Sequence, residues 1–129
     1  MKQTLWVGLG GLIGAIARYK IGGIILHHSE QWRFPLGTFC VNVAGCFILG
    51  TLAGLAEKQM IFTPDLRLFL FTGVLGGFTT FSAFAAEGLN LFRRGDVMVA
   101  LTYALLSVLC GLLAVWVGMK LFGTGIHRT

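Results

Sequence analysis

The chain has 129 residues, of which 56% are hydrophobic and only 12% are charged, and its formal net charge is +5. Soluble domains carry about a quarter charged residues, so this composition excludes an ordinary water-soluble globule. In so apolar a chain the positive charges are expected to set the orientation in a membrane, and we expect no nucleic-acid partner.

Four apolar stretches predict four transmembrane helices in one domain that covers residues 1–129. The stretches are residues 5–26, 36–56, 66–92 and 97–122. Each meets the roughly 20 residues that a helix needs to cross about 30 Å of hydrocarbon. The first stretch continues past Ala15-Ile16-Ala17, so we do not expect a cleaved signal peptide. The sequence therefore predicts an all-α, multi-pass protein of the cell inner (plasma) membrane.

Arg18 lies inside the first stretch, where a charged side chain is costly. Its guanidinium group either extends to the lipid headgroups together with Lys20, or sets a fixed positive charge at the mouth of a permeation path. The sequence leaves both interpretations open.

Glycines four residues apart recur in the first three stretches, which places each pair on one helix face. The pairs are Gly10 and Gly14, Gly50 and Gly54, and Gly73 and Gly77. In lipid, such faces let helix backbones approach closely enough for dispersion contacts to hold them together. We therefore predict tight helix packing at these positions.

The third stretch contains the run Gly76-Gly77-Phe78-Thr79-Thr80-Phe81-Ser82 in its middle. Two glycines followed by two β-branched threonines favour a break in the helix. Such a break must be buried in protein or line a cavity, because its freed carbonyl groups need partners. The carbonyls of Gly76 and Thr79 could bind a small hard cation, and two copies of the chain would supply four oxygens. A local kink satisfied by threonine hydroxyls is the alternative.

Phe81 and Phe84 are three residues apart and therefore lie on one face of the helix that resumes after the break. The edge of an aromatic ring is electropositive, so two such edges would suit an anion. Glu87 follows one turn after Phe84. Its carboxylate either carries protons or accepts hydrogen bonds that organise neighbouring hydroxyls, and the sequence does not choose between these roles.

Weak hydrogen-bond donors accompany these residues in the other stretches. Thr38 and Asn42 lie in the second stretch, Ser82 lies beside Phe81, and Tyr103 and Ser107 lie in the fourth. An amide offers two N–H donors and a hydroxyl offers one. Such donors suit a small anion because conduction requires that the ion is bound weakly enough to leave.

Basic residues are divided almost evenly between the two expected sides of the membrane. With both termini on one side, that side holds Lys2, Lys58, Arg67, Lys120 and Arg128, the other holds Arg33, Arg93 and Arg94, and Lys20 belongs to neither side clearly. So weak a bias would permit insertion both ways up. Four helices also cannot surround a water-filled path and still bury their own polar groups. We therefore predict an antiparallel, dual-topology homodimer with its two-fold axis in the membrane plane.

Three runs of this sequence together resemble the Fluc family of fluoride channels, also called CrcB proteins. They are Gly14-Ala15-Ile16-Ala17-Arg18, Pro35-Leu36-Gly37-Thr38 with Asn42 and Gly45, and the run from Gly76 to Ser82 with Phe84 and Glu87. The resemblance covers essentially the whole chain, and the combination is far more specific than any single run. It implies a dual-topology dimer with two antiparallel pores, each built by both subunits.

The resemblance also implies roles for individual residues. Phe81 and Phe84 would be the pore phenylalanines whose ring edges meet fluoride, and Asn42 would be the pore asparagine. Gly76 and Thr79 would supply backbone carbonyls to a structural sodium ion (Na+) at the dimer centre. Ser82, Tyr103 and Ser107 match the family's polar track, and Gly111 stands where a further hydroxyl would be expected.

The implied activity is passive export of fluoride, which needs no catalytic base, so we expect a channel and not an enzyme. A negative interior potential drives an anion outward with about 2.3 kcal/mol per charge per 100 mV. One alternative is a proton-coupled exporter of the small multidrug type, with Glu87 as the exchanging carboxylate. Such an exporter requires its proton-exchanging carboxylate near the middle of the membrane, whereas Glu87 lies towards the end of its stretch. The other alternative is a membrane subunit that transports nothing.

Overall fold

The computed structural model describes residues 1–58 and 62–123 of the chain. Residues 59–61 and 124–129, which include Arg128, lie outside the described part, as does the side chain of Lys58. Every regular element within the described residues is a helix. The elements are α1 (Lys2–His28), α2 (Leu36–Lys58), α3 (Pro64–Arg67), the π-helix η1 (Leu68–Leu75), α4 (Gly76–Phe78), α5 (Phe81–Arg93) and α6 (Val97–Phe122).

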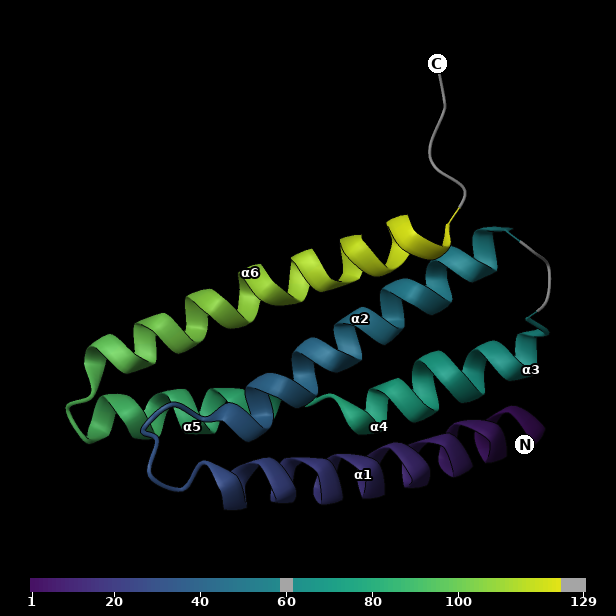
Figure 1. The fold of residues 1–129 in the computed structure, drawn as a ribbon. Helices are drawn as coiled ribbons and strands as arrows, with labels where there is room; N and C mark the ends of the chain where they lie inside the picture. Colours follow the sequence, from purple (N-terminus) through teal and green to yellow (C-terminus); the bar gives the residue numbers. More distant parts are fainter. Residues whose placement is uncertain (59–61, 124–129) are drawn as a thin grey trace.

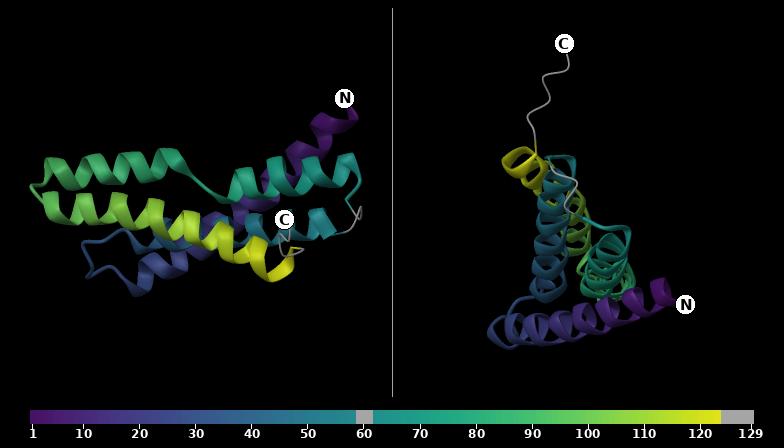
Figure 2. Two further views of the ribbon diagram at one scale, coloured as in Figure 1. Left: turned by 90° about the horizontal axis from the view of Figure 1, so that it is seen from above. Right: turned by 90° about the vertical axis from the view of Figure 1, so that its right-hand side faces the viewer.

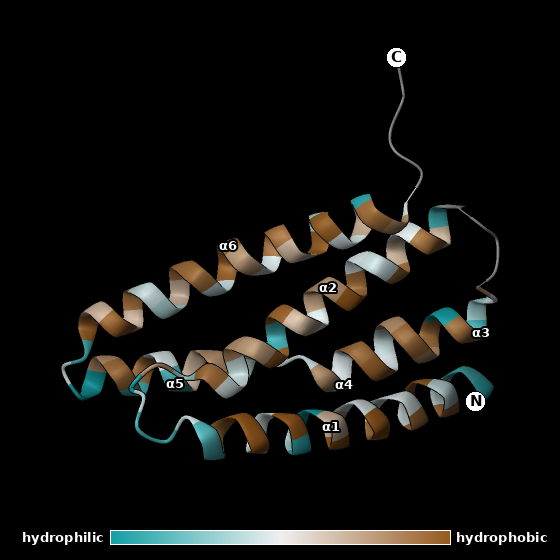
Figure 3. Ribbon diagram, viewed as in Figure 1, coloured by the Kyte–Doolittle hydropathy of each residue, from teal (hydrophilic) through white to brown (hydrophobic). Residues whose placement is uncertain are grey.

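The prediction of four membrane-spanning helical segments is confirmed. Four segments are long and apolar enough to cross a membrane: Lys2–His28, Leu36–Glu57, Pro64–Arg93 and Val97–Phe122. Large apolar side chains are exposed along them, as at Leu12, Leu105 and Leu112. Exposure of this extent suits hydrocarbon and not water. Figure 3 shows largely brown helices, with teal hydrophilic residues at the helix ends and a few within α1 and α2.

The third segment is built from four helical pieces. Thr63 caps its start, because the Thr63 hydroxyl accepts a hydrogen bond from the Leu66 N–H at 3.2 Å and Pro64 occupies the first turn. The π-helix η1 follows directly, and this wider helical form was not predicted from the sequence. Thr79 and Thr80 then have extended backbones, with φ and ψ of −83° and 157° and of −149° and 117°. The helix α5 starts at Phe81.

Glycines hold two groups of helices close together, as predicted. Helix α1 packs on η1 and α4, where a Cβ atom added to Gly10 would lie only 2.9 Å from the Gly73 Cα. Helix α2 packs on α6, where a Cβ atom on Gly54 would lie 2.9 Å from the Met119 carbonyl oxygen. Carbon atoms do not approach backbone so closely, so glycine is required at these contacts.

Seen from the side, the molecule places α6 beside α2, and α1 beside the α3 to α4 part of the third segment (Figure 1). The two further views show α1 crossing the bundle at an angle (Figure 2). Helix α5 packs on α6, and Leu91, Ala100 and Tyr103 form a small buried cluster between them. An ion pair joins the elements at each end: Lys2 with Asp65 at 2.9 Å and Arg33 with Asp96 at 2.7 Å.

Candidate functional site

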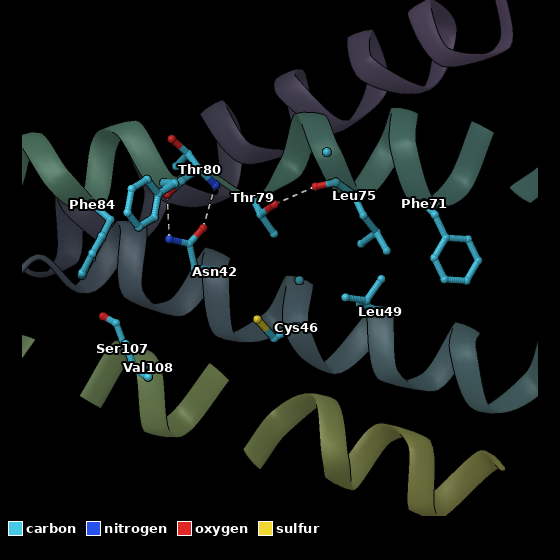
Figure 4. A pocket seen from close by; sticks show the side chains of 13 residues that line it. Asn42, Cys46, Leu49, Phe71, Leu75, Thr79, Thr80, Phe84, Ser107 and Val108 are labelled. Carbon is cyan, nitrogen blue, oxygen red and sulfur yellow. Dashed lines mark hydrogen bonds between the residues drawn. The ribbon is translucent and has the colours of Figure 1, made fainter. Parts of the chain in front are cut away.

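Asn42 of α2 binds the extended backbone between α4 and α5. Its Nδ2 donates to the Thr80 carbonyl at 2.9 Å, and its Oδ1 accepts from the Thr80 N–H at 2.8 Å. Figure 4 shows the Asn42 side chain reaching Thr80 with both bonds drawn. A primary amide can satisfy a peptide group in this way because it has a donor and an acceptor side by side. Asn42 therefore fixes the position of the Thr80 backbone.

The extended backbone between α4 and α5 also takes the helical donors away from two of the nearby carbonyl groups. In a continuous α-helix the Gly76 carbonyl would accept from the Thr80 N–H and the Thr79 carbonyl from the Ala83 N–H. Here the Thr80 N–H donates to Asn42, and the Ala83 N–H donates to the Thr80 hydroxyl at 3.2 Å. The regular donors of the Gly76 and Thr79 carbonyls are thus committed to other acceptors.

These two carbonyls fit the chemistry of a sodium ion. Unwound backbone carbonyls are the ligands that membrane proteins offer to Na+, and Gly76 and Thr79 line one cavity. The Thr79 hydroxyl does not compete for that role, because it donates to the Leu75 carbonyl at 2.9 Å. One chain supplies two such oxygens, so further ligands would have to come from elsewhere. In the described residues, no group of three or more His, Cys, Asp or Glu side chains forms an alternative metal site.

A cavity of about 400 Å³ lies between α2, the third segment and α6 (Figure 4). Six of the predicted site residues line it: Asn42, Gly76, Thr79, Phe81, Phe84 and Ser107. The rest of its lining is mostly apolar and includes the side chains of Leu49 and Phe71. The cavity therefore combines a few hydrogen-bonding groups and three aromatic rings with a largely apolar wall.

Phe81 and Phe84 begin a row of three aromatic rings. The ring centroids of Phe81 and Phe84 are 5.6 Å apart, and those of Phe84 and Tyr103 are 5.1 Å apart. Both pairs are tilted, at 43° and 54°, so neither stacks face to face. Phe84 is half-buried and Tyr103 is fully buried, whereas Phe81 is 78% exposed in the single chain. The row thus runs from the interior of α5 and α6 to an uncovered surface.

Glu87 accepts one hydrogen bond at each carboxylate oxygen. The Thr38 hydroxyl donates to Oε1 at 2.7 Å, and the Tyr103 hydroxyl donates to Oε2 at 2.7 Å. These bonds tie α2, α5 and α6 together through one side chain. Of the two roles that the sequence left open for Glu87, this geometry supplies the acceptor that organises hydroxyls.

A second cavity of about 400 Å³ lies on the other side of Thr80. It is lined by Arg18, Thr38, Glu87 and Thr80, together with residues of α1 and the start of α2. Thr80, from the run between Gly76 and Ser82, lines both cavities, and only 9% of its surface is exposed. Arg18 is half-buried here, which places its charge beside the cavity that holds Glu87.

The two remaining serines differ in their surroundings. Ser82 is exposed, and its hydroxyl lies 3.3 Å from the Thr80 hydroxyl. Ser107 faces the first cavity, and its hydroxyl is buried with no hydrogen-bond partner within the described residues. A buried donor without a partner is costly, so Ser107 is available to a ligand in the cavity.

Sequence reasoning did not select Thr80 or Cys46 as site residues, although both line the first cavity. Thr80 stands directly before the helix that begins at Phe81 and caps it through its hydroxyl. A threonine at that place in the run is a recognisable N-cap signal. Nothing local marks Cys46, whose place in the lining depends on how α2 is rotated in the bundle.

Comparison with known proteins extends these observations. A family model described as "CrcB-like protein, Camphor Resistance (CrcB)" matches residues 5–119. The chain is 50% identical over 121 residues to a protein of Methylobacillus flagellatus, and the match covers 94% of each chain. It is 40% identical to a protein of Flavobacterium psychrophilum over 92% of this chain and 95% of that one.

A protein of Nitratidesulfovibrio vulgaris is 41% identical, with 97% of this chain and 98% of the relative covered. All three relatives carry the name "Fluoride-specific ion channel FluC". These names describe channels. They give no support to the alternative function, a proton-coupled exporter with Glu87 as the exchanging carboxylate. With a family model that spans most of its length and relatives that match it almost end to end, the chain belongs to the CrcB family.

Proposed function

We propose that this chain is a subunit of a fluoride channel that lets the anion leave the cell passively. The observation that carries the proposal is the near full-length match to proteins named as fluoride-specific channels, at 50% identity in one case. The four membrane-spanning segments support it. The relatives compared come from bacteria, where a multi-pass protein of this kind lies in the plasma membrane.

The permeation path passes the two cavities that meet at Thr80. Phe81 and Phe84 offer ring edges to fluoride, and the hydroxyl of Ser107, which has no protein partner in the described residues, offers a donor. Asn42 acts at the junction of the cavities, where one of its amide protons is not used by Thr80. These groups are weak and uncharged, so they compensate for lost water without trapping the ion.

The second cavity forms the vestibule of the path. Arg18 attracts the anion there, and Thr38 and Glu87 form part of its wall. Tyr103 does not line the cavity but donates a hydrogen bond to Glu87. Ser82 continues the polar surface from the Thr80 hydroxyl to the exterior of the single chain. The Arg18 charge at the entry attracts anions without lying inside the narrow path, and both oxygens of the Glu87 carboxylate in the same cavity are bound to hydroxyls.

The extended pair Thr79 and Thr80 is a break in the third transmembrane helix at the middle of the membrane. Its freed carbonyls on Gly76 and Thr79 bind a structural sodium ion shared with a second copy of the chain. The hydrogen bonds that divert the Thr80 and Ala83 N–H groups support this role. A bound cation offsets part of the cost of bringing an anion into a dry path.

The channel is an antiparallel homodimer in which each pore uses residues of both subunits. The exposure of Phe81 supports this arrangement, because 78% of an aromatic side chain that lines the first cavity is uncovered in the single chain. The second copy covers this ring and closes the open side of the cavity. The near-even distribution of basic residues supports insertion in both orientations.

Flux from liposomes tests the function. Purified protein is reconstituted in vesicles loaded with potassium fluoride or potassium chloride, and release of anion is followed with electrodes after valinomycin is added. We expect fluoride to leave only when valinomycin balances its charge, and chloride to stay inside. Release that depends on a proton gradient, or equal release of both halides, would contradict the proposal.

A further inference from the structure

A groove lies on the surface where the loop between α1 and α2 meets the start of α6. Its volume is about 370 Å³, and its lining consists of Trp32, Arg33, Phe34, Met98, Val99 and Thr102. Four of these six side chains are apolar. The fluoride path does not pass through this groove. The groove lies at the end of the membrane-spanning segments, away from both cavities of the path.

The position of the groove spans two environments of a membrane. Trp32 is 59% exposed and lies in the polar loop, as tryptophans at the headgroup level do. Met98 is 73% exposed and lies with Val99 and Thr102 in the first turns of a membrane-spanning helix. One end of the groove therefore faces lipid headgroups, and the other end faces acyl chains. Figure 3 shows the hydrophilic turn before α6 and the apolar helix that follows it.

The charge around the groove is suited to a phosphate. Arg33 donates from Nη1 to Asp96 Oδ1 at 2.7 Å, yet its side chain remains largely exposed. A guanidinium group has five N–H donors, so this bond fixes the group and leaves others free for a second acceptor. Arg93 and Arg94 are exposed in the same turn as Asp96. The loop and this turn thus carry three arginines and two carboxylates, Asp96 and Glu30, so the excess charge is positive.

We propose that this groove binds an anionic phospholipid, with the lipid phosphate on Arg33 and one acyl chain along Met98 and Thr102. A zwitterionic lipid would bring its own cationic group into a region of excess positive charge, which disfavours it. A free phosphate would leave the apolar half of the groove empty. Basic pockets at the ends of transmembrane helices commonly select anionic headgroups for these reasons.

Fluorescence quenching by brominated lipids tests the proposal at Trp32. In a protein with Trp6→Phe and Trp116→Phe, Trp32 is the single tryptophan, and heavy bromine atoms quench it only at short range. The protein is placed in vesicles of phosphatidylglycerol and phosphatidylcholine, with either one brominated at the same mole fraction. We expect an apparent preference for phosphatidylglycerol of about fivefold, the ratio that corresponds to about 1 kcal/mol for one basic side chain.

Variants separate a built site from general attraction to a negative surface. Arg33→Gln should remove most of the preference, and Arg33→Lys should retain part of it. Arg93→Gln with Arg94→Gln should lower it less, because these residues do not line the groove. Arg67→Gln is the matched control, because Arg67 is an exposed arginine that contacts Phe71 near the opposite end. It should leave the preference unchanged.

A second reporter gives the outcome that would overturn the proposal. Trp116 lies beside a cation, with Lys120 Nζ 5.7 Å from its ring centroid. A protein with Trp116 as its single tryptophan should show a weaker preference than the Trp32 protein. Equal preference at both tryptophans, equal quenching of Trp32 by both lipids, or full preference in Arg33→Gln would each show that no specific site exists.

Discussion

Asn42 makes two hydrogen bonds to Thr80, so replacing it should strongly reduce fluoride flux. Asn42→Ala removes both hydrogen bonds to Thr80, and about 1 kcal/mol for each bond predicts a loss of roughly 2 kcal/mol at the junction of the cavities. We expect fluoride flux in liposomes to fall at least tenfold. Asn90→Ala is the control, since Asn90 is an exposed amide on the same third segment. Unchanged flux in Asn42→Ala would show that the clamp on Thr80 is dispensable.

Glu87 and Tyr103 should affect flux as a pair, because the Tyr103 hydroxyl donates a hydrogen bond to one carboxylate oxygen of Glu87. Glu87→Gln and Tyr103→Phe should each slow fluoride flux, and the double variant should be little slower than the more severe single one. Non-additivity of this kind is expected for groups that share a hydrogen bond. The measurement is the set of four flux rates in one lipid mixture. Strictly multiplicative losses would mean that the two side chains act independently.

The electropositive ring edges of Phe81 and Phe84 are expected to contact fluoride in the path. Phe81→Ile keeps an apolar side chain of similar bulk but removes the electropositive edge. We expect slower fluoride release with an unchanged elution volume of the purified protein, measured by liposome flux and size-exclusion chromatography. Phe69→Ile provides the control, because Phe69 contacts Trp6 and does not line the first cavity. A Phe81→Ile protein with full flux would remove the ring edge from the mechanism.

Helix packing depends on glycine contacts that tolerate no added carbon. A Cβ atom on Gly14 would collide with the Val74 carbonyl and lie 2.8 Å from the Phe78 N, so α1 would have to move away from the third segment. Overpacking of this kind costs about 1–3 kcal/mol. Gly14→Ala should therefore lower the melting temperature of the purified protein, followed by tryptophan fluorescence. Gly8→Ala in the same helix is the control, because nothing lies within 4 Å of its added carbon, and it should melt as the parent does.

The proposed sodium site and the proposed dimer both need two copies of the chain. If the carbonyls of Gly76 and Thr79 bind Na+ between two copies, replacing sodium by N-methylglucamine should destabilise the dimer. We expect a lower melting temperature and a shift towards the monomer in size-exclusion chromatography, both reversed by sodium and not by choline. Identical behaviour in the two salts would remove sodium from the assembly. Fluoride flux measured in the same salts would show independently whether the channel itself remains active.

Four helical segments, tight packing at paired glycines and family membership could all be predicted from the sequence. Apolar length and local spacing determine them, and lipid imposes both requirements on any such chain. The sequence also named Asn42, Glu87 and Tyr103 as site residues, but as donors or acceptors without known partners. Their roles in conducting fluoride stay predictions.

Only the tertiary structure decided what these residues bind. Asn42 meets Thr80 across 38 positions, Thr38 meets Glu87 across 49, and Tyr103 meets Glu87 across 16. Such pairs depend on the rotation and register of one helix against another, which no local pattern records. The same rotation determines that Cys46 lines the first cavity and that Phe81 is left uncovered. Hydropathy places a helix in the membrane because burial depends on each side chain alone, whereas a hydrogen bond between helices depends on two side chains at once.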